Sequence, residues 1–377
     1  MRRTGLQFAA MYFLLAIQTV RADAPEDFVA RFDRMDQRIN KGQGYCASLN
    51  TSGELAWAEA YILQGYIEMY RATKDRAYLD SLVEHFDKVL ASRDDVRKVK
   101  DYYRKVPMAG WGSNEYSRQR WHVWAVHTGV ICLGPAEFVR TVYGISKLRR
   151  EYGDKGDEYL TRVKEAVAAN DPDWRDGPGK DEGHYVDASL GVGPLPLNQQ
   201  NALGSIIVEL YRITRDHAYK ERAMKLAVYF KRRLHLTDDG AYEWSYQPRE
   251  DTSSNGSEDI SHAAINIDFA LRCRWAHIVF KQKEMLAFTR TWTTKIRRGP
   301  GEWANTVAGT GGTNTHIPSA LGRWLDLCQF DRSIIADARR AFAKVDEDKA
   351  TAANMLGIAK LARWERRIRT GIPDDQE

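Results

Sequence analysis

The sequence contains few of the features by which metal sites, disulfide scaffolds and common hydrolase centres are identified. Only four of its 377 residues are cysteines, and no two of them form a CxxC pair, which argues against a zinc knuckle or a disulfide framework. There is no HExxH motif and no GxSxG nucleophile elbow. The glycine-rich run at 309–312 lacks the GK[ST] ending of a phosphate-binding loop. The sequence therefore predicts neither a metal nor a cofactor.

The chain also lacks a domain linker and a run that could form a central sheet. No segment rich in proline, glycine and serine divides it. Residues 242–246 form the one convincing segment with the two-residue period of a strand. We therefore expect one all-α domain over residues 23–377.

Residues 1–22 have the order of a signal peptide. Arg2 and Arg3 precede a mostly apolar stretch over 6–20, and Ala22 supplies a small residue at a plausible cleavage point. Removal of this segment, which contains Arg2, Arg3 and Arg21 and no acidic residue, lowers the formal charge from +5 to +2. The basic pI therefore does not indicate nucleic-acid binding.

We expect a secreted or periplasmic protein that is not attached to a membrane after cleavage. The alternative is a retained membrane anchor, which Gln7 and Gln18 disfavour because they shorten the apolar run below a bilayer span.

One phrase occurs twice in the chain. Residues 70–78 read YRATKDRAY and residues 211–219 read YRITRDHAY, and each copy lies between two amphipathic stretches. Each copy therefore predicts a helix, a short turn and a returning helix. Because one hairpin can bury only one face, several must stack or close into a ring. The repeat predicts an α/α toroid, a scaffold whose central mouth commonly handles carbohydrate.

Helical periodicity dominates the rest of the chain, and four long segments interrupt it. The segments 99–126, 171–197, 238–257 and 297–317 are rich in aromatic, polar and glycine residues. Segments of this length in a compact domain are usually functional, and we expect these to build the mouth. Further helices are expected over 130–151, 157–169, 198–214, 218–234, 258–279, 282–296, 319–328, 332–345 and 351–369.

The most specific candidate site lies at the start of the helix expected from residue 258. A spacing of four places Glu258, His262 and Asn266 on one helix face. A histidine near a helix N-terminus stays neutral more easily, which keeps it available as a general base. The alternative is a core histidine bonded to a backbone carbonyl.

The neighbouring carboxylates have an alternative role in the helix itself. Glu258 and Asp259 would lie in the first turn, where negative charge complements the positive helix end, and Ser257 or Asn255 would cap it.

Four successive amides, residues 198–201, open the second repeat hairpin. Asn198 and Asn201 could donate hydrogen bonds to sugar hydroxyls or to a carboxylate. Asn198 is equally suited to be the N-cap of its helix.

Two aromatic segments indicate sugar contacts. In an extended strand Tyr242, Trp244 and Tyr246 would share one face and form a stacking platform beside Glu243, although structural packing of these rings is an equal alternative. In the other segment, cations alternate with aromatic residues, which suits an anionic sugar or cation–π packing on the surface. Its candidate substrate contacts are Arg118, Arg120 and His122.

The repeat, the signal peptide, the amides at 198–201, the aromatic residues at 242–246 and the helix start at 258–262 together resemble the α/α-toroid polysaccharide lyases. Within them the chain is most similar to the glucuronan and alginate lyases of family 38.

This resemblance implies β-elimination at a uronic acid. Asn198 or Asn201 would neutralise the C5 carboxylate, assisted by a protonated Glu258. His262 and a tyrosine, Tyr246 or Tyr242, would share the base and acid roles. Neutralisation matters because the C5 proton becomes acidic only when preorganised donors stabilise the developing charge.

The sequence therefore predicts a monomeric polysaccharide lyase that acts on an anionic, uronic-acid-containing polymer. A glycoside hydrolase on the same scaffold is the first alternative, and it would need two carboxylates on either side of the bond. An epimerase and a non-catalytic glycan-binding protein are the others. The carboxylates available to a hydrolase are Glu243, Glu258, Asp259 and Asp187.

Overall fold

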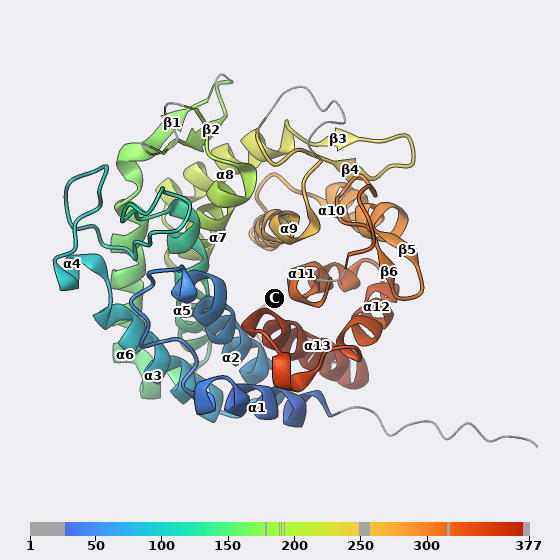
Figure 1. Ribbon diagram of the computed structural model, residues 1–377, viewed down its shortest axis with the longest axis horizontal. Helices are drawn as coiled ribbons and strands as arrows, with labels where there is room; N and C mark the ends of the chain where they lie inside the picture. The colour runs from blue at the N-terminus through green and yellow to red at the C-terminus, as the bar shows by residue number, and fades with distance from the viewer. Residues whose placement is uncertain are drawn as a thin grey trace, which may run out of the picture.

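The computed structural model describes residues 27–371, apart from residues 178, 188, 190, 192, 249–256 and 315–316. The expected signal peptide and Asn255 lie outside the described residues. Twelve helices pair into hairpins that close into a two-layered ring, with one helix of each pair inside and one outside (Figure 1). The chain is an all-α toroid, as the repeat predicts.

Six helices form the inner layer, and each packs against the next around the ring. The last of them, α13, packs against the first, α2, and this contact closes the circle. The inner helices are α2 (Ala60–Thr73), α5 (Ala125–Gly144), α7 (Leu197–Thr214), α9 (Ile260–Trp275), α11 (Ile317–Trp324) and α13 (Ala352–Thr370).

Six helices form the outer layer. Five of them contact the inner helix that precedes them in the chain, and α1 packs against α13. A short helix, α4 (Asp94–Arg97), lies in a loop outside the two layers. The outer helices are α1 (Phe28–Arg38), α3 (Ala77–Ala91), α6 (Ser146–Ala168), α8 (His217–Lys231), α10 (Gln282–Arg290) and α12 (Ser333–Phe342).

The two layers follow from the distribution of apolar residues. Helix α5 is buried on nearly every face, as expected for a helix enclosed by others. The inner helices also approach one another closely. A Cβ at Gly129 of α5 would lie 2.4 Å from the carbonyl carbon of Ala202 in α7, so only glycine permits this contact.

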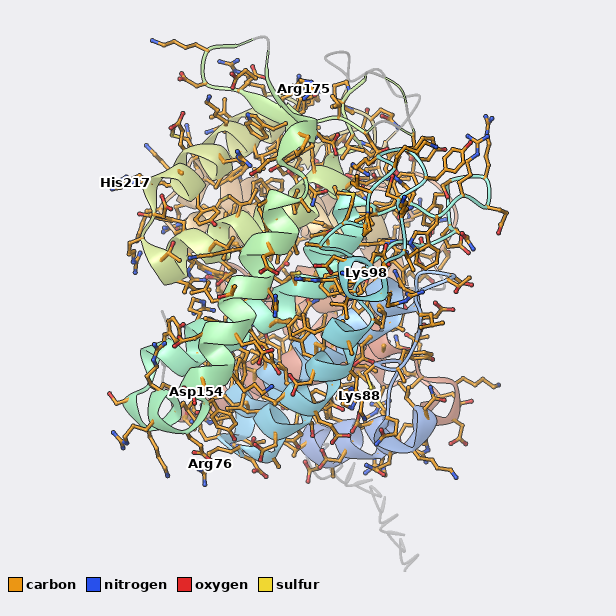
Figure 2. All side chains as sticks on the ribbon, turned by 90° about the vertical axis from the view of Figure 1, so that its left-hand side faces the viewer. Arg76, Lys88, Lys98, Asp154, Arg175 and His217 are labelled. Carbon is orange, nitrogen blue, oxygen red and sulfur yellow. The ribbon has the colours of Figure 1, made fainter. Side chains whose placement is uncertain are left out.

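The two copies of the repeated phrase have the same turn, which confirms the predicted hairpins. Lys74 is the C-cap of α2 and Arg215 is the C-cap of α7, and both residues have left-handed backbones. Their N–H groups bond to Tyr70 and Tyr211 at 2.7 and 2.8 Å. Figure 2 shows the ring from the side, with Arg76 and His217 of these two turns toward the same edge.

The helix boundaries predicted between residues 130 and 169 are wrong. A break was expected between 151 and 157, but α6 runs through these residues without interruption. The apolar pattern suggested a continuous helix over 130–151, but the extended backbone of Ile145 separates α5 from α6. The apolar stripe continues across this turn because both helices pack against the same core. Periodicity alone therefore does not reveal the break.

Within the described residues, the strands form three small hairpins in the loops that precede inner helices. They are β1 (Trp174–Asp176) with β2 (Gly183–Tyr185), β3 (His235–Leu236) with β4 (Tyr242–Glu243), and β5 (Arg297–Gly299) with β6 (Glu302–Trp303). Each hairpin is antiparallel. Together with the loop between α3 and α5 they surround the N-terminal ends of the inner helices, which we call the mouth (Figure 1).

The four cysteines are buried and free. Among the described helices, none combines the length and the apolar character needed to cross a membrane.

Candidate active site at the mouth

Glu258 is a fully enclosed acidic residue of the mouth. It lies two residues before α9, and its backbone is held on both sides. Its N–H bonds to the carbonyl of Trp244, and its carbonyl accepts from the N–H of Val307, each at 3.0 Å. Its side chain has no exposed surface. The residue is therefore fixed in position by two separate loops before its carboxyl group makes any contact.

The two carboxyl oxygens of Glu258 have different surroundings. Oε2 accepts hydrogen bonds from the indole N–H of Trp244 and, at 2.6 Å, from Nδ2 of Asn266. Oε1 has no hydrogen-bond partner among the described residues. Burial raises the pKa of Glu258 well above its usual value, against the opposing effect of the Trp244 hydrogen bond. Because donors occupy Oε2, Oε1 is the oxygen suited to hold a proton when the carboxyl is neutral.

Asp259 has the opposite character although it is the next residue. It is the N-cap of α9, and Oδ1 accepts from the N–H groups of Ser261 and His262 at 2.9 and 3.2 Å. Burial opposes ionisation, but the His262 side chain and these N–H groups lower the pKa of Asp259 below its usual value. The cap predicted at Ser257 or Asn255 is thus replaced by Asp259, whose short side chain reaches the first-turn N–H groups.

His262 is not a core residue. Its Nδ1 is hydrogen-bonded to Asp259, and its side chain is 46% exposed. The ring lies against Tyr246, with 4.9 Å between centroids. The expected stripe of Glu258, His262 and Asn266 forms only in part, because the helix begins at Ile260 and His262 turns to Asp259 instead.

Tyr246 connects the loop after β4 to helix α7. Its hydroxyl is 3.5 Å from Nε2 of Gln199, and its carbonyl accepts from the N–H of Leu197 at 3.1 Å. Burial is the main cause that raises its pKa, and the charges of Glu258 and Asp259 add to it. Tyr246 is therefore a phenol that retains its proton beside His262.

The amides at the start of α7 lie inside the ring. Pro196 is the N-cap, so the alternative role of Asn198 as a cap does not apply. Asn198 is buried, and its Oδ1 has no hydrogen-bond partner among the described residues. Asn201 donates to Oδ1 of Asn266 at 2.6 Å and so extends the Glu258 network to α7.

The aromatic platform predicted over 242–246 does not form. The strand ends at Glu243, and Trp244 is buried against Phe230 and Phe288. Tyr242 packs on Phe288, with 5.1 Å between centroids. The three side chains therefore do not share a face.

The neighbouring Glu243 is half-buried, and its carboxylate lies 3.5 Å from Nζ of Lys295. Of the aromatic residues in 242–246, only Tyr246 stands beside His262.

The segment 118–122 is divided between surface and core. Arg118 and Arg120 are exposed, and Arg120 lies over the ring of Tyr102 at 4.5 Å. His122 is buried and both of its ring nitrogens contact carboxylates, which argues against the substrate contact expected of it.

His122 instead links two loops of the rim. Its Nδ1 is 2.8 Å from Asp101, and its Nε2 is 2.9 Å from Asp187. Burial opposes the charged ring, but the two carboxylates raise the pKa of His122 above its usual value. Asp187 is committed to this contact, so it is not available as the carboxylate of a hydrolase.

Five residues of the mouth were not among the site residues predicted from the sequence. Trp57 and His127 lie edge to face at 5.4 Å, and both ring nitrogens of His127 lack hydrogen-bond partners among the described residues. Burial lowers the pKa of His127 to about 3, so its ring is neutral. Tyr116 is 66% exposed, and Arg323 lies 4.3 Å from the ring of Tyr61. The sequence could have indicated these residues only by their positions just before or within the inner helices.

One group of side chains in the described chain has the spacing of a metal site. Ligand atoms of Cys46, Glu59 and His85 lie within 4.8 Å of one another, and all three residues are buried. Both nitrogens of His85 are occupied, by Glu59 at 2.7 Å and by the carbonyl of Gly42 at 3.2 Å. The second oxygen of Glu59 accepts from the N–H of Tyr45. These hydrogen bonds hold the loop after α1 in place.

The sequence matches no protein family and no curated protein, but the fold has solved relatives. An α-mannanase of glycoside hydrolase family 76 from Bacteroides thetaiotaomicron superimposes with a TM-score of 0.58 at 15% identity, covering 91% of this chain and 98% of its own. A family 76 α-1,6-mannanase from Salegentibacter sp. HEL1_6 gives 0.57 at 11%, covering 90% and 99%. The latter is an inactive variant with two consecutive aspartates replaced by asparagine, in complex with α-1,6-mannotriose.

A polysaccharide lyase gives a TM-score of 0.54 at 12% identity, covering 92% of this chain and 99% of its own. At these identities the similarity establishes the α/α toroid alone.

Proposed function

We propose that the protein is a glycan-cleaving enzyme whose mouth hydrolyses a glycosidic bond with Glu258 and Asp259. The observation that carries the proposal is the opposite electrostatic character of these consecutive residues. The pKa of Glu258 is raised and that of Asp259 is lowered. Two carboxyl groups whose environments separate their pKa values are typical of an acid and a base in one site.

Glu258 is suited to be the general acid. Its proton would lie on Oε1, which is buried and has no partner among the described residues, so the proposal requires that bound substrate reach this oxygen. The donors on Oε2 hold the carboxyl in one orientation. After transfer of this proton to the departing glycosidic oxygen, the same two donors would stabilise the carboxylate.

Asp259 is suited to the second role. It is ionised and 46% exposed, so it can accept a proton from a water molecule that attacks the sugar. His262 holds Oδ2 of Asp259, and the helix start holds Oδ1. The positive end of α9 also favours the negative charge on Asp259.

The comparisons support this choice over the elimination that the sequence favoured. Two of the similar structures are family 76 glycoside hydrolases, and one is inactive after two consecutive aspartates were replaced. Glu258 and Asp259 are likewise consecutive and stand at an inner-helix start. We extend the proposal to a neutral α-linked glycan as the first substrate to test. Export of residues 23–377 would bring the enzyme to such a polymer.

Elimination is the second candidate because of the contact between Tyr246 and His262. Their rings are 4.9 Å apart, and one nitrogen of His262 is held by Asp259. This pair could remove the C5 proton of a uronic acid and protonate the leaving O4, with Asn198 nearby in the chain of amides on α7. The substrate of this reaction would be anionic.

One experiment separates the two reactions. The purified protein is incubated with α-1,6-mannan, alginate and glucuronan, and both new reducing ends and ultraviolet absorbance are followed. Hydrolysis gives reducing ends alone, whereas elimination also gives an unsaturated product that absorbs. Cleavage of α-1,6-mannan without absorbance is the expected result. Absorbance that rises with cleavage would replace the hydrolase by the lyase, and no cleavage of any polymer would reject both.

A further inference from the structure

Arg323 of α11 reaches across the ring to Tyr61 of α2. Its guanidinium carbon lies 4.3 Å from the centre of the Tyr61 ring, although α13 stands between these two helices in the inner layer (Figure 1). Helices α11 and α13 pack closely beside this contact, since a Cβ at Gly322 would lie 3.2 Å from Cα of Gly357. Arg323 therefore extends into the interior of the ring instead of lying between neighbouring helices.

Arg323 lies at the level of the two proposed catalytic carboxyl groups. The next residue, Trp324, donates from its indole N–H to the carbonyl of Ile260 at 3.0 Å. Ile260 is the first residue of α9 and directly follows Asp259. Tyr61 is the second residue of α2, which also starts at the mouth. The contact of Arg323 with Tyr61, which we call the floor of the mouth, thus lies near the start of α9.

The guanidinium of Arg323 is enclosed but incompletely paired. Only 4% of the residue's surface is exposed. In the part of the chain that the structure describes, Arg323 makes no ion pair, and its Nη2 is buried without an acceptor. A buried donor without a partner costs free energy, and the ring of Tyr61 offsets only part of this cost. Nη2 therefore remains available to an acceptor that a ligand brings.

Acceptors without a partner lie on the other side of α9, at the start of α7. Oδ1 of Asn198 and Oε1 of Gln199 are buried and accept no hydrogen bond from a described residue. Gln199 lies beside Tyr246, whose ring is 4.9 Å from that of His262. These oxygens therefore belong to the same mouth, which combines an unpartnered donor on α11 with unpartnered acceptors on α7.

Hydroxyl groups suit this combination better than an anion does. A hydroxyl can accept from Arg323 and also donate to an amide oxygen, whereas a carboxylate or phosphate only accepts. An anion would also lie near Asp259, whose carboxyl the His262 side chain and the first-turn N–H groups hold in its ionised form. The guanidinium presents its N–H groups in one plane, so it can donate to two neighbouring hydroxyls of one sugar ring.

We propose that Arg323 determines which sugar binds at the floor of the mouth, by donating hydrogen bonds to hydroxyl groups of a neutral sugar unit. Other hydroxyls of the bound glycan donate to Asn198 and Gln199. The inference rests on the proposed function, because it places this sugar beside Glu258 and Asp259. It requires that the sugar reach the buried Nη2. Arg323 is a substrate-binding residue in this account and transfers no proton.

The test measures binding without turnover, in the Glu258→Gln protein. Three neutral trisaccharides, α-1,6-mannotriose, isomaltotriose and maltotriose, are titrated by calorimetry, with a glucuronan trisaccharide as the anionic comparison. At least one neutral trisaccharide should bind. Arg323→Met should weaken its binding at least about tenfold, whereas Arg150→Met on the exposed face of α6 should not. Arg323→Lys should restore only part of the affinity, because lysine keeps the charge but lacks the planar guanidinium.

Stability separates this binding role from a structural one. Arg323→Met removes a buried charge that has no ion pair among the described residues, so Tm should stay the same or rise. A lowered Tm with unchanged affinity would assign Arg323 to the fold and overturn the proposal. Tighter binding of the glucuronan trisaccharide that depends on Arg323 would overturn it as well, and so would the failure of every neutral trisaccharide to bind.

Failure of the proposed chemistry gives a different signal. Turnover by the Glu258→Gln protein would reject Glu258 as the acid, and it would appear as cleaved product in the titrated sample. The affinity difference between Arg323→Met and Arg150→Met tests the sugar contact alone, whether or not Glu258 is the acid.

Discussion

Nδ2 of Asn266 donates a 2.6 Å hydrogen bond to Oε2 of Glu258. This bond joins the candidate acid to the second turn of α9, and Asn201 extends it to α7. Since Trp244 donates to the same oxygen, Oε1 is left to carry the proton. The position of the Glu258 proton thus depends on Trp244, in the loop before α9, and on Asn266 and Asn201, in two different helices.

The pH dependence of cleavage should reflect the two carboxyl groups. With Glu258 as the acid, kcat/KM should fall as pH rises through the raised pKa of Glu258. It should also fall as pH drops through the lowered pKa of Asp259. Asp259→Asn should remove the acidic limb and reduce the rate about 100- to 10,000-fold. A variant that retains the wild-type rate and both limbs would contradict the role of Asp259.

Replacement of His262 separates the two candidate reactions. In hydrolysis His262 supports Asp259, so His262→Ala should raise the pKa of Asp259 and move the acidic limb to higher pH. Much of the activity should remain at neutral pH. In elimination the same variant should lose about 100- to 10,000-fold in rate at every pH. Activity and Tm measured on one sample distinguish lost chemistry from lost stability.

Tyr116 should contribute to substrate binding rather than to the chemical step. It is 66% exposed, and its ring centroid lies 6.2 Å from that of Trp124 at the mouth. Tyr116→Ala should raise KM, because a stacking surface is lost, and leave kcat nearly unchanged. Ile368→Ala, which truncates an exposed apolar residue of α13, is the control. A fall in kcat at unchanged KM would assign Tyr116 to the reaction instead.

The link between His122 and two aspartates should make stability depend on pH. The pKa of His122 is raised, so its contribution is complete below the unfolded value of about 6.5 and is lost as pH rises through the folded value. The pKa values of Asp101 and Asp187 are lowered, so their contribution is lost as pH falls below about 3.8.

His122→Gln should therefore lower the free energy of unfolding most near pH 5.5, by about 3–5 kcal/mol. Chemical denaturation at pH 5.5 and pH 9 measures this difference, which should narrow at pH 9. An equal loss of unfolding free energy at pH 5.5 and at pH 9 would show that the charge on His122 contributes nothing to stability.

The fold was predictable because it repeats. Two copies of one turn sequence, with the same contacts at Lys74 and Arg215, specify hairpins that must close to bury their inner helices. The break at Ile145 was not predictable in the same way, because its neighbours on both sides face one core. Local pattern determines the elements, and packing determines where they end.

The site was predictable only in part. The sequence places Glu258, Asp259 and His262 together because they share a helix start. It does not show that Trp244 turns into the core toward Glu258, since alternation predicts a shared face for Tyr242 and Tyr246. Contacts between residues from separate helices, such as that of Trp57 with His127, depend on closure of the ring and leave no local pattern.

The most direct test of the account compares Glu258→Gln with Glu302→Gln on the polymer that the wild type cleaves. Glu302 is exposed in β6, so its variant controls for the loss of one carboxylate. Glu258→Gln preserves the size of the side chain but cannot supply the proton. We predict that its kcat falls about 100- to 10,000-fold while Tm changes little and the control remains active. Wild-type turnover by a folded Glu258→Gln protein would contradict the account.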